Sequence, residues 1–141
     1  MIDCVSKINT GGKYDSEAFK KSVGLNGVGT KVVNALSSHF VVKSFREGKV
    51  KIAEFAFGDL IKDFPLSKNS EREGTLVSFV PDNTIFKNFH FIHEYVEKQI
   101  WYYVCLNPGL IISYNGHEHV SKRGLLDLLE REIDDEVRYQ P

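Results

Sequence analysis

A glycine-rich turn that runs directly into a helical stretch is the feature that most constrains this chain of 141 residues. Residues 24–30 read G-L-N-G-V-G-T, and residues 31–36 continue K-V-V-N-A-L. Glycine lacks a Cβ atom, so it can adopt positive φ and let the main chain approach a ligand closely. The first N–H groups of a helix lack intrahelical acceptors, and the helix dipole places partial positive charge there. The turn therefore predicts an anion site, with phosphate as the first candidate.

Two other phosphate-binding loops fit the turn less well. A P-loop has lysine and then serine or threonine after its last glycine, whereas Thr30 and Lys31 follow Gly29 in the reverse order. A dinucleotide-binding loop requires a third glycine where Val32 stands and a hydrophobic strand before the turn, which residues 17–23 do not provide. A purely structural loop-to-helix turn, in which glycine serves only the geometry, stays open on these residues alone.

Three blocks of sequence extend the pattern beyond the turn. They are residues 11–15 (GGKYD), 19–29 (FKKSVGLNGVG) and 33–37 (VNALS). At this spacing they resemble the ATPase region of bacterial type IIA DNA topoisomerases, namely the B subunits of topoisomerase IV and DNA gyrase. That region shares its ATP-binding fold with Hsp90, histidine kinases and MutL proteins. The resemblance covers nearly the whole chain.

The resemblance implies roles for particular residues. It assigns residues 1–23 to the ATP lid, the backbone of the glycine turn to the ATP phosphates, and the threonine of a Gly-Thr pair to the space beneath the adenine ring. A solvated lysine cluster and an ordinary β-branched strand residue are the plainer alternatives. The expected ATP-binding residues are Lys13, Lys20, Gly24, Leu25, Asn26, Gly27, Val28, Gly29, Thr30 and Thr75.

Several residues that the family uses for catalysis do not occur in this sequence. The family has a catalytic glutamate, an Mg²⁺-binding asparagine four residues later, and an Asp-x-Gly-x-Gly turn whose aspartate binds adenine. No glutamate here has asparagine four positions later, and no Asp-x-Gly-x-Gly occurs. The resemblance therefore implies a single partial ATPase domain over 1–141, with 24–141 carrying the turn, sheet and C-terminal helices, and with no catalytic residue of its own.

The expected function follows from the same resemblance. The whole protein would use ATP and Mg²⁺ to drive DNA strand passage together with a topoisomerase A subunit, and its B subunits would dimerise when ATP binds. The isolated 141 residues are expected not to hydrolyse ATP. The alternative is a non-catalytic, degenerate nucleotide-binding or scaffold domain of the same fold.

Composition narrows the class of protein further. A formal net charge of −1 gives no basic surface for a DNA backbone, so any action on DNA is expected to be indirect. Cys4 and Cys105 have no metal-site spacing and no secretory signal accompanies them, which predicts reduced thiols in the cytoplasm. No apolar run reaches the ~18–20 residues that span a bilayer, so no membrane is expected.

Histidine pairs are the other candidates for chemistry. His117 and His119 are expected to share one face of a strand, and His90 and His93 to lie one helical turn apart. Neither pair has a third ligand nearby in sequence, so we predict no zinc site.

Hydrophobic periodicity and turn residues predict an α+β fold. We expect a two-layer α/β sandwich with a mixed, mostly antiparallel sheet, the second half of the gyrase/Hsp90-like fold. Residues 58–73 are expected to be an exposed loop with at most a short strand at 60–61, and 74–81 to be a central strand buried on both sides. The predicted helices are 30–37, 89–104 and 124–133, and the other predicted strands are 40–45, 49–57, 110–114 and 117–120.

Overall fold

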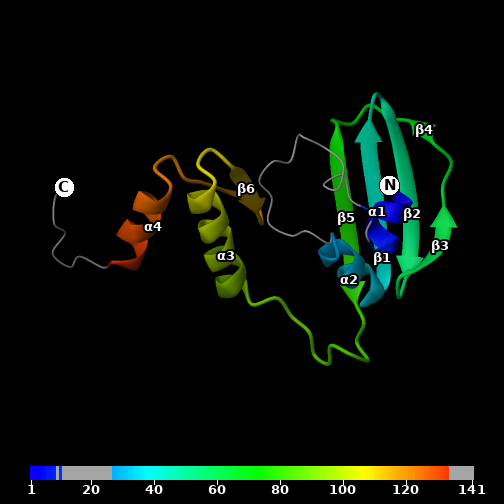
Figure 1. Cartoon of the computed structure of the whole chain (residues 1–141), viewed down its shortest axis with the longest axis horizontal. Helices are drawn as coiled ribbons and strands as arrows, with labels where there is room; N and C mark the ends of the chain where they lie inside the picture. Colours follow the sequence, from blue (N-terminus) through cyan, green and yellow to red (C-terminus); the bar gives the residue numbers. More distant parts are fainter. Residues whose placement is uncertain (9, 11–26, 134–141) are drawn as a thin grey trace. The chain divides into compact units, whose positions relative to one another are not determined.

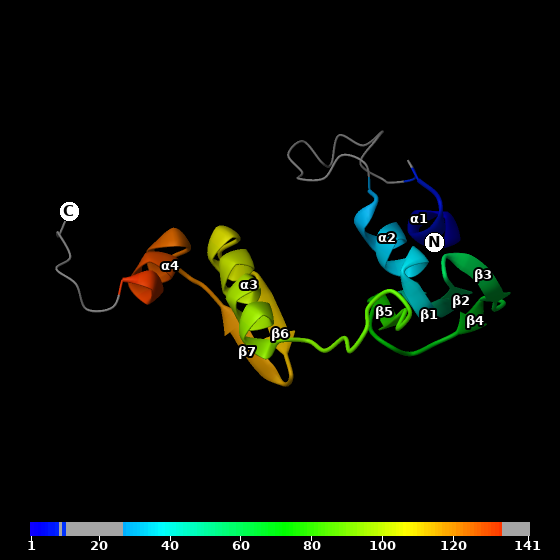
Figure 2. The same cartoon turned by 90° about the horizontal axis from the view of Figure 1, so that it is seen from below.

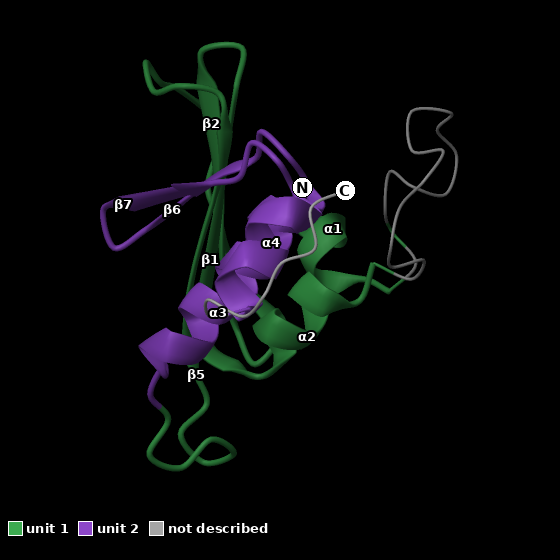
Figure 3. Cartoon of the chain, turned by 90° about the vertical axis from the view of Figure 1, so that its left-hand side faces the viewer, with its two compact units in different colours: residues 1–89 green, residues 90–141 purple. Residues whose placement is uncertain are grey.

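The computed structural model describes residues 1–8, 10 and 27–133. The chain has two compact units, residues 1–89 and 90–141, shown in green and purple in Figure 3. Each unit has a buried hydrophobic cluster of its own. The described elements confirm the α+β class, and every described strand pair is antiparallel. The assignment of 1–141 to a single partial domain stays a prediction.

Unit 1 is a sheet with two short helices on one of its faces (Figure 2). The strand order is β3-β2-β1-β5, and β4 also pairs with β2. Val5 and Val33 from the helices pack against Phe40 and Phe55 from the sheet. The elements of this unit are α1 (Ile2–Ser6), α2 (Gly29–Ala35), β1 (Ser37–Arg46), β2 (Lys49–Ala56), β3 (Asp59–Asp63), β4 (Ser67–Lys68) and β5 (Gly74–Pro81).

The hairpin of β1 and β2 forms the centre of this sheet, as predicted. Its two turn residues, Glu47 and Gly48, both have positive φ, of 52° and 67°, which suits the right-handed twist of a two-residue hairpin. Phe40 lies opposite Phe55, and their rings meet edge to face with centroids 6.0 Å apart. Both side chains are fully buried. The alternating apolar residues of the two strands therefore face the helices.

Three expectations for unit 1 were wrong. The helix predicted for 30–37 ends earlier, at Ala35, and Ser37 already belongs to β1. Residues 58–73 contain β3 and β4, more strand than the polar composition indicated. Strand β5 is not central: only β1 flanks it among the described strands, and Val80 is 53% exposed. Apolar residues on both faces are typical of a strand covered on both sides, but within unit 1 the apolar side chains of β5 are exposed.

Unit 2 is a helical pair with a small hairpin. The hairpin turn is Asn115-Gly116, and both residues have positive φ, 49° and 83°, as this dipeptide predicts. Helix α3 supplies the buried cluster of Ile100, Val104 and Cys105, against which the hairpin and Leu128 of the last helix pack. The elements are α3 (His93–Leu106), β6 (Ile111–Tyr114), β7 (His117–Val120) and α4 (Leu125–Glu132), as Figures 1 and 2 together show.

The predicted helices of unit 2 exist, but their buried faces differ from those expected. Helix α3 begins at His93, so His90 and His93 are not one helical turn apart within it. Helical spacing with Val96 and Ile100 predicts that Tyr103 shares their buried face, but Tyr103 is 59% exposed. Leu125 and Leu129 of α4 are also exposed, and only Leu128 of its leucines packs on the cluster. No helix among the described residues is long and apolar enough to cross a membrane.

Candidate phosphate-binding site

The described part of the glycine turn lies at the start of α2. Gly27 has φ +56°, a left-handed conformation that glycine adopts without strain. The residue before the helix, Val28, has no side-chain oxygen, and no side-chain cap is formed there. Residues 27–30 are all exposed. No side chain therefore caps the first backbone N–H groups of α2, as an anion site requires.

Two polar residues of α2, Lys31 and Asn34, are buried. Asn34 is fully buried, and its Nδ2 donates to the carbonyl oxygen of Val5 over 3.0 Å. Lys31, 6% exposed, donates from Nζ to the carbonyl oxygen of Thr10 over 3.2 Å. The Thr10 hydroxyl in turn lies 2.6 Å from the carbonyl oxygen of Asp3. These bonds fasten the first turns of α2 to α1 and to Thr10.

Lys31 also lies against the glycine turn. A Cβ atom added to Gly27 would lie 3.5 Å from the Lys31 Nζ atom. The Lys31 ammonium group therefore points back toward the N-terminus of α2 and lies close to Gly27. Lys31 was not among the predicted site residues. The signal that could have found it is its helical position, because side chains on a helix point toward the N-terminus.

The predicted site residues divide into three groups. Residues 27–30 come together at the start of α2, as expected from sequence. Thr75 lies elsewhere: it pairs with Ser44, whereas Ser37, which follows α2, pairs with Pro81 at the other end of β5 (Figure 1). The described residues thus do not bring Thr75 to the turn. The residues outside the described part are Lys13, Lys20, Gly24, Leu25 and Asn26.

Two histidines of unit 2, His93 and His119, contact aromatic rings. His119 meets the Trp101 ring edge to face with centroids 5.5 Å apart, and His93 is hydrogen-bonded to the Tyr114 hydroxyl. The guanidinium carbon of Arg131 lies over the Trp101 ring, 4.2 Å from its centroid. Within the described ranges, no group of three or more His, Cys, Asp or Glu side chains could hold a metal ion.

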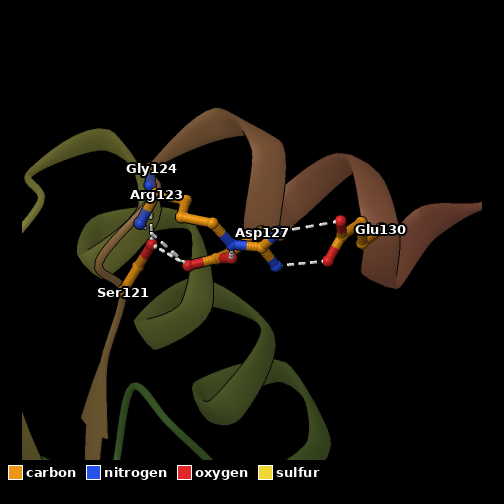
Figure 4. A network of polar contacts seen from close by, with 5 residues as sticks. All are labelled: Ser121, Arg123, Gly124, Asp127 and Glu130. Atoms are coloured by element: carbon orange, nitrogen blue, oxygen red, sulfur yellow. Dashed lines mark hydrogen bonds and ion pairs between the residues drawn. The ribbon is translucent and has the colours of Figure 1, made fainter. Parts of the chain in front are cut away.

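A polar network fixes the start of α4 in unit 2 (Figure 4). The Asp127 carboxylate accepts hydrogen bonds from the Ser121 hydroxyl over 2.7 Å, the Arg123 backbone N–H over 3.1 Å and the Arg123 Nε over 2.7 Å. Arg123 also forms an ion pair with Glu130. The Ser121 hydroxyl oxygen accepts from the Gly124 N–H over 2.9 Å. The network closes the loop onto the first turn of α4, which indicates a structural role.

This network predicts acid sensitivity of α4. The pKa of Asp127 is lowered from its ordinary 3.8, first by the Ser121 hydroxyl and then by the Arg123 backbone N–H. A carboxyl with a lowered folded pKa stabilises the fold above its ordinary pKa, and this is lost as the pH falls through the folded value. We expect the NMR shifts of α4 residues to move toward coil values below pH 3.8. In Asp127→Asn this pH dependence should disappear, and an identical acid profile in both proteins would contradict the prediction.

Comparison with known proteins gives two results for the sequence. No protein-family model matches the chain. The chain is 47% identical over 140 residues to the B subunit of DNA topoisomerase 4 from Borreliella burgdorferi, a match that covers 99% of this chain and 23% of that protein. It is 35% identical to the corresponding protein of Mycoplasma capricolum, over 94% of this chain and 22% of that protein.

The structure of the chain is also similar to a solved structure of a related protein. The 43K ATPase domain of Thermus thermophilus gyrase B, solved in complex with an aminocoumarin, matches with a TM-score of 0.68 and 31% identity. The chain is homologous to the B subunits of topoisomerase IV and DNA gyrase. The match to the gyrase B structure covers 78% of this chain and 32% of that ATPase domain. The chain thus spans less than a quarter of the two topoisomerase IV B subunits and about a third of the gyrase B ATPase domain.

Proposed function

We propose that the chain forms the phosphate-binding part of the ATP site in a topoisomerase IV or gyrase B subunit. The observation that carries this proposal is the exposed start of α2, where Gly27 takes a left-handed conformation and no side chain caps the helix. Such a backbone favours an anion. The homology to a gyrase B ATPase domain makes the ATP phosphates the anion of choice.

The described residues fit a polyphosphate and supply binding groups rather than chemistry. The N–H groups at residues 27–30 would hold phosphate oxygens, and the Lys31 ammonium would add positive charge beside them. ATP, when bound, would supply the phosphoanhydride bond that the whole B subunit would hydrolyse. We retain Lys13, Lys20 and Thr75 as further proposed contacts, the last to adenine. Because the described residues gather no metal-binding group of acidic or histidine side chains, Mg²⁺ enters the proposal only with the nucleotide.

The wider role is that of the B subunit in a type II topoisomerase. In that role, ATP binding would bring two B subunits together, and hydrolysis would be coupled to DNA strand passage with the A subunit. A net charge of −1 supports an indirect action on DNA for these residues. Cys4 and Cys105 are both free thiols, which supports a place in a reducing compartment such as the cytoplasm.

The proposal is tested by titrating the ¹⁵N-labelled chain with ATP and following the amide signals of Gly27 and Gly29. We expect shifts that saturate and that adenosine, which lacks phosphate, does not reproduce. Signals of the unit 2 turn at Gly116 are an internal control and should not move. Absence of any shift at Gly27 and Gly29 at millimolar ATP would contradict the proposal for this chain.

The same protein is expected to hydrolyse no ATP. Phosphoryl transfer to water requires a positioned base and charge stabilisation, and the sequence has no glutamate followed four residues later by asparagine. The measurement is phosphate release from purified chain with ATP and Mg²⁺, compared with a sample without protein. Turnover that depends on Mg²⁺ and on protein concentration would show that the chain carries a base that we have not identified.

A further inference from the structure

Lys31 is a buried cation without an acidic partner in the described part of the chain. Its side chain is 6% exposed, and no Asp or Glu of those residues forms an ion pair with it. Within the described ranges, its ammonium donates a hydrogen bond to the Thr10 carbonyl oxygen. An ammonium group has three N–H donors, and this carbonyl accepts from one of them. Burying a charge without compensation is unfavourable, so the site favours an anion.

The position of the ammonium points to where that anion would lie. Lys31 is the third residue of α2 (Gly29–Ala35), and its side chain returns along the helix until Nζ lies near Gly27. Gly27 has no side chain, and a Cβ there would lie 3.5 Å from Nζ. The N–H groups of the turn and the ammonium group of Lys31 therefore lie around the same residue. Either feature alone would be weak, but together they combine backbone donors with a full positive charge.

The order Thr30-Lys31 does not rule out lysine as a phosphate ligand. It is reversed relative to a P-loop, in which the lysine directly follows the last glycine. Here the lysine is one residue further into the helix, and the backward tilt of helical side chains brings its end to the turn. A lysine can thus reach a glycine-rich loop from a position one residue further into the helix.

We propose that Lys31 is a phosphate-binding residue, whose ammonium donates to an anionic oxygen seated at Gly27. The identification of that oxygen as part of ATP rests on the proposed function, whereas the attraction of Lys31 for a polyphosphate does not. The bond to Thr10 holds the ammonium in place.

The test separates the charge of Lys31 from its bond to Thr10. In Lys31→Gln the side-chain amide can still donate to the Thr10 carbonyl, but the positive charge is gone. In Lys31→Arg the charge is kept. Lys68→Gln, at an exposed lysine in β4, removes the same charge elsewhere. Calorimetric titration of the 141-residue chain with ATP and, separately, with inorganic tripolyphosphate measures the affinity of each variant.

We expect Lys31→Gln to weaken binding of both ligands by about 10-fold or more, the effect of losing one charge-assisted hydrogen bond. Lys31→Arg should retain most of the affinity, and Lys68→Gln should match the original chain. Circular dichroism of each variant checks that it is folded. A purely structural role would lower the melting temperature of Lys31→Gln while leaving its affinity for both ligands unchanged.

The two ligands make the possible failures distinguishable. If the original chain binds both ligands and Lys31→Gln binds them equally well, the role of Lys31 is overturned and the proposed function stands. If tripolyphosphate binds in a Lys31-dependent way and ATP does not bind, Lys31 is supported and the proposed ATP site is overturned. If neither ligand binds the original chain, both proposals are overturned for this chain.

Discussion

Replacing Phe40 by alanine is expected to lower the free energy of unfolding of unit 1 by about 3–5 kcal/mol. Phe40 is fully buried in β1, the strand that pairs with β2 on one side and β5 on the other. Its ring packs edge to face against Phe55, which is also fully buried. Loss of the ring would leave a cavity that the flanking strands cannot close without breaking their pairing.

A matched control lies directly across the sheet. Phe79 of β5 pairs with Phe40 in register but is 39% exposed, so Phe79→Ala should cost only about 1 kcal/mol. Urea denaturation followed by far-ultraviolet circular dichroism measures both variants. The one tryptophan of the sequence, Trp101, belongs to unit 2, so its fluorescence would not report on this core. Equal losses for the two variants would show that the cluster around Phe40 is not the main source of stability.

Replacing Gly124 by alanine should destabilise unit 2 by about 2–4 kcal/mol, because backbone strain at residue 124 and steric overlap of the new Cβ atom both destabilise the folded state. Gly124 precedes α4 with φ 63° and ψ −124°, a conformation that side chains rarely allow. An added Cβ would lie 3.0 Å from the Pro108 Cγ atom and 3.1 Å from the backbone oxygen of Cys105. The start of α4 would have to move away from the end of α3, which would disturb the network around Asp127.

The fluorescence of Trp101 reports this change, since Trp101 packs against the cluster of unit 2 and carries the α4 residue Arg131 over its ring. Gly116→Ala is the control: Gly116 has φ +83°, but an added Cβ there would meet nothing within 4 Å. It should therefore show the strain alone, about 1 kcal/mol. If both variants lowered the free energy of unfolding equally, the steric overlap at Gly124 would contribute nothing to the loss of stability.

Local signals in the sequence were sufficient for most elements of the fold. Asn115-Gly116 predicted its hairpin because both residues readily take positive φ, and the apolar residues of 31–36 predicted α2. Burial was predicted less well. The sequences of β5 and α4 show which of their residues are apolar. Burial of those residues also depends on which other elements cover them. That information is not present within a single strand or helix.

The candidate site shows the same division. The turn at 27–30 could be identified from glycine spacing, because the required backbone conformation is a local property. Lys31 could not, because its position depends on a helix that turns its side chain back to Gly27 and on Thr10, which is distant in sequence. The predicted contact of Thr75 came only from family resemblance, and the described sheet does not place Thr75 beside the turn.

The two edges of the unit 1 sheet differ in a way that limits how molecules could associate. Edge strand β3 (Asp59–Asp63) carries Asp59, Lys62 and Asp63, whereas β5 (Gly74–Pro81) has no charged residue over its whole length. Charged residues on an edge discourage pairing with another chain. The sheet therefore has one edge whose charged residues discourage pairing with another strand, and one edge without such residues. Among the described strands, pairing with a partner is therefore expected through β5 rather than through β3.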